Sequence, residues 1–236
     1  DYLPFTIELG RSFIQPNYQG TNIKHKGLYS LDNLWDGLGA LVVKYPKIKY
    51  FFGKVTMYTS YNLRARNILL NFLNTFFPDN ENLVIPYEPL DFDSSNPYYK
   101  ELFNANDYKE SYKTLSKEVR TLGENIPPLI NSYMNLSPSM KVFGTSINGG
   151  FGGVEETGIL VNISHIYPEK IERYISPILQ LAIKLRPKWW TPAKPQIPNS
   201  EKPKGRIIEK LPRKIKKAVK KKGNDSKGND AKSQDN

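Results

Sequence analysis

The order of the secondary-structure signals in the first 57 residues constrains the fold of this chain most strongly. Residues 6–14 alternate apolar and polar side chains, which predicts a strand. Residues 30–45 place apolar side chains at spacings of three and four, which predicts a helix, and residues 49–57 predict a second strand. This order predicts a parallel strand pair joined by a right-handed crossover. We therefore expect an α/β or α+β domain whose mixed, twisted sheet is flanked by helices.

The rest of the chain adds further elements and then changes character. The patterns predict helices at 61–77, 108–122 and 168–185, a short helix or turn at 127–136, an extended segment at 83–90, and strands at 141–147 and 155–163. The glycine-rich link at 149–153 lies between two strands rather than before a helix, so a hairpin loop fits it better than a phosphate cradle. We divide the chain into a domain at 1–186, a proline-rich linker at 187–205 and a basic tail at 206–236.

The net charge of +11 is concentrated in the tail. Residues 202–236 hold 13 of the 34 Lys and Arg and 4 of the 23 Asp and Glu, a net charge of +9. Residues 1–201 therefore carry a net charge of only +2. The basic isoelectric point of the whole chain is thus no sign that the domain binds nucleic acid.

Several classes of chemistry are excluded by what the sequence lacks. It contains no cysteine and only two histidines, His25 and His165, so cysteine nucleophiles and thiolate metal sites are impossible and a histidine-rich metal site is not expected. The serine-hydrolase elbow and the nucleotide phosphate loop are also missing, and we expect no bound cofactor. If the chain is an acyltransferase, direct attack of an amine on a thioester is the simplest chemistry left. That reaction needs a base and a hydrogen-bond donor for the oxyanion.

Glu8 and Arg11 are charged residues in an otherwise apolar strand pattern. A spacing of three places them on opposite faces of a regular strand, and they would converge only at a bulge, which Gly10 permits. On spacing alone, a structural ion pair or two charges at a sheet edge fits better than a catalytic pair.

Asp32 and Asp36 lie one turn apart in the first predicted helix, so they share a face near its positive N-terminus. One interpretation is a solvated face that complements the helix dipole. The other is an anionic patch that binds the ammonium group of a substrate. Asn33 and Trp35 lie in the same turns and complete this candidate substrate-binding set.

Five stretches of the sequence, at residues 8–19, 27–38, 49–58, 122–129 and 153–160, resemble a family of bacterial proteins often labelled hemolysins. Its better-understood members resemble the N-acyltransferases of ornithine-lipid and glycine-lipid synthesis, which take the acyl group from acyl carrier protein. The chain is similar to the Bacteroidetes branch in particular. More distantly, Glu8-x-x-Arg11 followed by Ser12 and Phe13 resembles a signature of acyl-homoserine-lactone synthases, which have the GNAT acyltransferase fold.

This resemblance implies a fold, a reaction and roles for two residues. It implies a GNAT-like sheet and transfer of a 3-hydroxyacyl group from acyl carrier protein to the amino group of ornithine or glycine. Glu8 is then expected to be the base or to orient the amine, and Arg11 to hold Glu8 or the acyl carbonyl. The N-terminal strands of the family are expected to precede Asp1, so this chain would hold the second half of the GNAT core and is not expected to suffice for activity.

The alternative is a non-catalytic protein tethered to a membrane or to nucleic acid, or a hemolysin-like protein. Residues 206–222 place apolar side chains at helical spacings among lysines, which suits an anionic membrane surface or, second, the acidic carrier protein. A disordered, solubilising tail is the competing interpretation. No aromatic residue interleaves the lysines, which argues against nucleic acid. We expect a cytoplasmic protein peripheral to the inner membrane, with acyl carrier protein, an amino acid and anionic lipid as partners.

Overall fold

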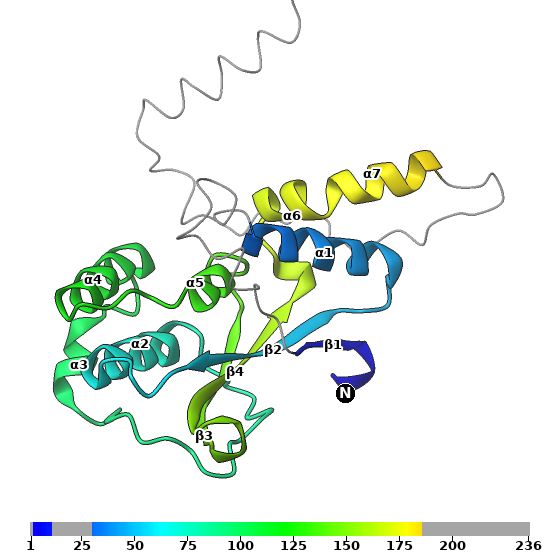
Figure 1. Ribbon diagram of the computed structural model, residues 1–236. Coiled ribbons are helices and arrows are strands. Elements are labelled where there is room, and N and C mark those ends of the chain that lie inside the picture. Colours follow the sequence, from blue (N-terminus) through cyan, green and yellow to red (C-terminus); the bar gives the residue numbers. More distant parts are fainter. Residues whose placement is uncertain (1, 11–29, 186–236) are drawn as a thin grey trace, which may run out of the picture. The chain divides into compact units, whose positions relative to one another are not determined.

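A computed structural model describes residues 2–10 and 30–185 of the chain (Figure 1). The described residues form the strands β1 (Thr6–Leu9), β2 (Tyr50–Met57), β3 (Lys141–Asn148) and β4 (Val154–Asn162). They also form the helices α1 (Ser30–Lys44), α2 (Leu63–Phe76), α3 (Pro97–Leu102), α4 (Tyr108–Thr121), α5 (Pro128–Met134), α6 (Pro168–Tyr174) and α7 (Ser176–Leu185). Three 3-10 turns are added at η1 (Leu3–Phe5), η4 (Gly149–Phe151) and η5 (Ile163–His165).

The four strands form one mixed sheet in the order β1-β2-β4-β3. β1 and β2 are parallel and are connected through α1, which confirms the predicted order of strand, helix and strand. The part of the first predicted strand at 11–14 lies outside the described residues. β4 is antiparallel to both β2 and β3, and η4 lies in the predicted hairpin link between β3 and β4. The predicted class, a mixed sheet flanked by helices, is therefore confirmed, and the arrangement is consistent with a GNAT-like fold (Figure 1).

One face of the sheet and the helices share a single hydrophobic core. The face contributes alternate residues of β2 and β4, such as Phe51, Val55 and Ile159, which are at most 2% exposed. α2 contributes the fully buried Ile68 and Phe72. Figure 1 shows α2, α3, α4 and α5 gathered around one part of the sheet, while α1, α6 and α7 form a second group.

Local chemistry explains where the helices begin and end. The Asn62 side chain caps α2 by accepting hydrogen bonds from the backbone N–H groups of residues 64 and 65, at 3.0 and 3.2 Å. α4 ends before Gly123, whose φ of +80° few other residues adopt. The helix predicted at 168–185, with an interruption at Pro177, is two helices, α6 and α7, which meet at Ile175. Pro177 lacks a backbone N–H, and it lies in the first turn of α7, where no such donor is needed.

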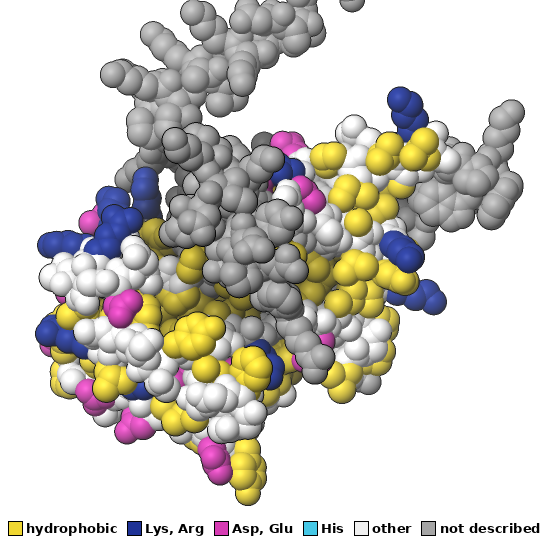
Figure 2. All heavy atoms as spheres, viewed as in Figure 1, with side chains coloured by type: hydrophobic (Ala, Val, Ile, Leu, Met, Phe, Trp, Pro, Cys, Tyr) yellow, Lys and Arg dark blue, Asp and Glu magenta, His cyan; other side chains and the backbone are white. Residues whose placement is uncertain are grey.

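α7 exposes an apolar surface to solvent. Leu181, Ile183 and Leu185 are 55%, 43% and 71% exposed, and Figure 2 shows hydrophobic side chains gathered along this helix. None of the helices in residues 30–185 is long and apolar enough to cross a membrane. The predicted linker at 187–205 and tail at 206–236 lie outside the described residues.

Candidate active site

Among the described residues, the parallel pairing of β1 with β2 ends before β2 does. β1 pairs with β2 from Thr6 opposite Tyr50 to Leu9 opposite Gly53. β2 continues to Met57, so beyond Gly53 its β1 side has no strand partner among the described residues. Ligands of open α/β sheets bind at the carboxyl ends of parallel strands, where neighbouring strands separate. We therefore take the end of this pairing as the candidate active site.

Glu8 lies beside this point, on the sheet face that is turned away from the core. Its neighbours Ile7 and Leu9 pack against the core, so the Glu8 side chain points to the other face, where it is exposed. Its cross-strand partner on that face is Phe52. Glu8 forms no ion pair with any described residue. Arg11 lies outside the described residues, so the convergence of the two side chains stays a prediction.

Tyr133 of α5 reaches the end of the β1–β2 pairing from the core side. A Cβ atom at Gly53 would lie 2.5 Å from the Tyr133 hydroxyl oxygen, so any side chain at this strand position would displace that hydroxyl. Tyr133 is 3% exposed, and burial raises its pKa to about 12. Its phenol therefore stays protonated at neutral pH and can donate a hydrogen bond to a developing negative charge. Glu8 and Tyr133 thus approach the same end of β1 from opposite faces of the sheet.

Asp32 and Asp36 share one face of α1, as predicted, and that face binds Arg173 of α6. Nη2 of Arg173 lies 2.9 Å from Asp32 and Nη1 lies 2.9 Å from Asp36. The Asp36 and Asp32 carboxylates raise the pKa of Arg173. Tyr174 also donates a hydrogen bond to Asp32. Burial, and to a lesser extent this hydrogen bond, raises the pKa of Tyr174 to about 12. The two carboxylates can hold a cation, but a substrate ammonium would have to take the place of Arg173.

The other two predicted substrate-binding residues have different surroundings. Trp35 is 7% exposed and belongs to the core, where it packs edge-to-face on Tyr133 with ring centroids 5.4 Å apart. The centroids of the Trp35 and Tyr174 rings lie 6.5 Å apart. Asn33 is exposed. Trp35 therefore packs against both Tyr133 and Tyr174, the hydrogen-bond partner of Asp32, whereas Asn33 lies at the surface.

A buried ion pair lies at the carboxyl end of β2. Glu155 of β4 is paired with Met57, and it accepts a hydrogen bond from Nη1 of Arg66 at 2.6 Å. The two residues are 5% and 9% exposed. Arg66 also donates to the side chain of Asn67, at 3.0 Å from Nε and 2.7 Å from Nη2. This pair fixes the start of α2 against the sheet.

Other reactive combinations are weaker candidates. Ser139 Oγ lies 2.6 Å from His165 Nδ1, but the pair is exposed and no described carboxylate orients the imidazole. It therefore lacks the third member that activates a serine nucleophile. The described residues contain no cluster of His, Asp and Glu that could hold a metal ion.

Sequence reasoning missed Tyr133, Arg66, Arg173 and the role of Glu155. Gly53 was the available signal for Tyr133, because a glycine inside a strand marks the close approach of another group. Glu155 was visible as a carboxylate on the core-facing register of a strand. Nothing in a single sequence connects it to a residue 89 positions away.

Two curated proteins match this chain over 180 residues, or 76% of its length. The chain is 52% identical to a protein of Phocaeicola vulgatus and 54% identical to one of Bacteroides thetaiotaomicron, both named glycine N(alpha)-acyltransferase. The matched part covers 55% and 53% of these proteins, so the chain spans about half the length of the curated relatives it matches. No protein-family profile and no solved structure matches the chain. These two relatives support an acyltransferase family for this chain.

Proposed function

We propose that this chain belongs to an enzyme that transfers a fatty acyl group from the thioester of acyl carrier protein to the α-amino group of glycine. The observation that carries the proposal is the 52–54% identity to two proteins named for acyl transfer to glycine. Ornithine, the other acceptor that the sequence suggested, has no such support. A non-catalytic binding role has no specific observation in its favour.

The geometry at the end of the β1–β2 pairing supports this chemistry. The glycine ammonium first loses a proton to become a nucleophilic amine. The amine attacks the thioester carbonyl, a C–N bond forms, the C–S bond breaks, and the nitrogen loses a second proton while the thiolate gains one. A thioester held at the end of the described β1–β2 pairing would have Glu8 on one face of the sheet and Tyr133 on the other. Glu8 is the candidate acceptor for the ammonium proton, and neutral Tyr133 is the candidate donor to the departing sulfur. Arg11 remains the candidate that orients Glu8 or the acyl carbonyl.

A hybrid enzyme tests this proposal. The 180 matched residues of the Bacteroides thetaiotaomicron relative are replaced by those of this chain, and the purified hybrid receives labelled glycine or ornithine with acyl carrier protein thioester or acyl-CoA. We expect N-acylglycine from the carrier thioester, detected by mass spectrometry. The matched control is the hybrid with Glu8→Gln, which lacks the candidate base and so shows how much of the product depends on catalysis by the enzyme.

The outcomes separate the parts of the proposal. Product from ornithine alone would replace the acceptor, and equal rates with acyl-CoA would replace the donor. A folded hybrid that makes no product while the parent relative is active would refute the proposed function of this chain.

A further inference from the structure

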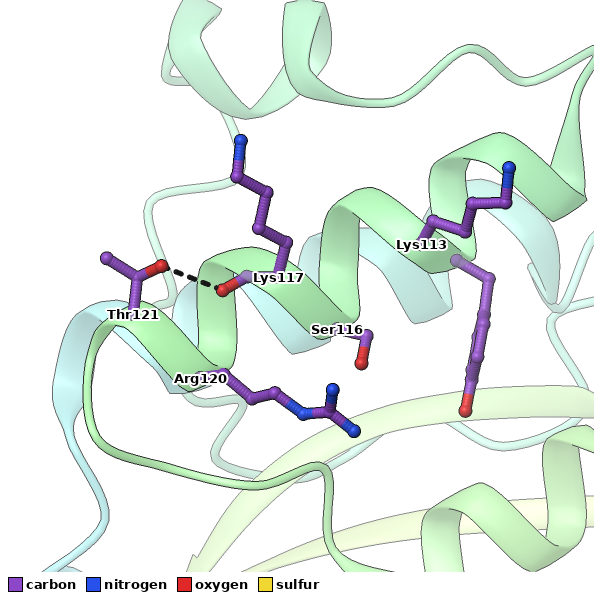
Figure 3. A pocket seen from close by; sticks show the side chains of 6 residues that line it. Lys113, Ser116, Lys117, Arg120 and Thr121 are labelled. Atoms are coloured by element: carbon purple, nitrogen blue, oxygen red, sulfur yellow. Dashed lines mark hydrogen bonds between the residues drawn. The ribbon is translucent and has the colours of Figure 1, made fainter.

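The outer face of α4 carries a line of basic side chains along an open groove. Lys113, Lys117 and Arg120 are spaced four and three residues apart, which places them on one face of a helix. The buried residues of α4, Ser111, Leu115 and Val119, lie on the opposite face. The groove has a volume of about 560 Å³, and its lining is Tyr112, Lys113, Ser116, Lys117, Arg120 and Thr121. Figure 3 shows the Lys113 and Lys117 side chains extending to the same side of α4, while the Arg120 side chain extends toward Ser116.

Most of the positive charge on this face is available to a partner. Lys117 and Arg120 are exposed and form no ion pair with a described residue. Lys113 pairs with Glu110 at 2.7 Å, but both side chains are more than 60% exposed, so the pair is weak and readily exchanged. Lys109 adds a further exposed cation one turn before Lys113. The face therefore holds four cations, and the carboxylates that act on Lys113 are those of Glu110 and, more weakly, Asp107 at the start of α4.

The groove is connected to the candidate active site through a single short helix. Tyr112, which lines the groove, donates a hydrogen bond to the side chain of Asn131 in α5 at 2.7 Å. Two residues further along α5, Tyr133 points to the sheet and lies over Gly53. Residues two apart on a helix point to different sides, so α5 stands between the groove and the end of the β1–β2 pairing.

We propose that this face of α4 docks the acyl carrier protein, an inference that rests on the proposed function. The carrier is a small acidic protein that must bring its thioester to the site from outside. A row of exposed cations next to the helix that carries Tyr133 complements the acidic surface of such a partner, and two of them, Lys117 and Arg120, have no ion-pair partner among the described residues. Arg120 and its neighbours would hold the carrier surface while the flexible arm of the carrier reaches past α5 to the end of the described β1–β2 pairing.

The test is binding of labelled carrier protein to the intact 236-residue chain, measured by fluorescence anisotropy without glycine and without turnover. The Lys117→Glu/Arg120→Glu variant should raise the Kd by about tenfold or more and should reduce its dependence on salt. Two controls make equal changes of charge elsewhere: Lys100→Glu/Lys184→Glu on other described helices, and Lys216→Glu/Lys217→Glu in the tail. Both should change the Kd by less than about twofold. Circular dichroism checks that each variant is folded.

Each outcome decides a different question. Unchanged binding by the Lys117→Glu/Arg120→Glu variant, or an equal loss in either control, overturns the docking surface. A chain that binds the carrier through α4 while its hybrid enzyme transfers no acyl group would refute the proposed function and leave the docking surface standing. In the active hybrid, the α4 variant should lose rate with carrier thioester and keep its rate with a small acyl-pantetheine thioester. An equal loss with both donors would show a structural role for these residues and refute docking.

Discussion

Replacing Glu155 by glutamine should destabilise the fold strongly, because it removes the charge that compensates a buried guanidinium. Arg66 is 9% exposed and Glu155 is 5% exposed, and their ion pair measures 2.6 Å. The Gln side chain has nearly the same volume, so packing changes little. The perturbation therefore isolates the electrostatic part of the interaction.

The size of the effect follows from what remains around Arg66. Removing one member of a buried ion pair costs about 3–5 kcal/mol, because the other charge stays buried without a partner. Arg66 keeps its two hydrogen bonds to Asn67 and a long one, 3.4 Å, to the carbonyl oxygen of Asp91. We therefore expect the lower end, a loss of about 3 kcal/mol in the free energy of unfolding. For a chain of this size the melting temperature should fall by roughly 6–12 °C.

The adjacent residue of β4 provides a matched control. Glu156 points to the opposite face of the sheet and pairs with Lys54 at 2.9 Å. The Lys54 side chain is 48% exposed, so Glu156→Gln should cost at most about 1 kcal/mol. Urea unfolding followed by circular dichroism measures both variants and the unchanged chain.

The same reasoning predicts that removing both charges is tolerated better than removing one. The Arg66→Met/Glu155→Leu variant leaves no buried charge, so it should recover most of the stability lost in Glu155→Gln. Equal losses for Glu155→Gln and Glu156→Gln would refute the argument that burial sets the cost. A double variant less stable than the single one would show that the geometry of the pair, rather than its charge balance, holds α2 in place.

Other perturbations probe the candidate base, a buried phenol and the tail. In the hybrid enzyme, Glu8→Gln should lower kcat by about 10² or more, and near-normal turnover would remove Glu8 as the base. Burial raises the pKa of Tyr133 from 10 to about 12, so its stabilising contribution is complete below pH 10 and is lost as the pH rises through 12. Between pH 10 and pH 12 the unchanged chain should therefore lose about 2–3 kcal/mol of unfolding free energy through Tyr133, and Tyr133→Phe should abolish this part of the loss. Urea unfolding at the two pH values measures the loss, and an equal loss in the variant and the unchanged chain would contradict the argument. Truncation after residue 200 should weaken co-sedimentation with anionic vesicles, and equal binding by both chains would exclude the tail as an electrostatic anchor.

The elements that sequence periodicity predicts correctly are those whose cause is local. The apolar stripe at 30–45 and the alternation at 49–57 fix a helix and a strand, because each pattern has one face that must be buried. The same local logic places Asp32 and Asp36 on one side of α1, where both carboxylates reach a single guanidinium. α3 was not predicted, because a helix of six residues held by an Asn96 cap leaves almost no periodic signal.

The sequence alone does not predict which distant residues pair with the side chains on these faces. Arg173 is separated from Asp36 by 137 residues, and Arg66 from Glu155 by 89. Each pairing depends on the order of strands and on the packing of helices over them. The identity of a carboxylate as a substrate site or as half of an internal ion pair is therefore decided by tertiary structure. From the sequence alone, the carboxylates of Asp32 and Asp36 fit a substrate site and an internal ion pair equally well.

Trp35 links Asp32, which was predicted to bind substrate, to Tyr133, which only the structure places at the candidate site. Gly39 lies one turn along α1, and any side chain there would collide with the backbone carbonyl of Tyr174. That close approach, together with the bonds from Arg173 and Tyr174 to Asp32, fixes α6 against α1. Trp35 is held beneath this contact, and Tyr133 packs on its ring with the hydroxyl over Gly53. The acidic face of α1 is therefore connected to the end of the described β1–β2 pairing by packing: the contacts run from Asp32 through Tyr174 and Trp35 to the phenol of Tyr133.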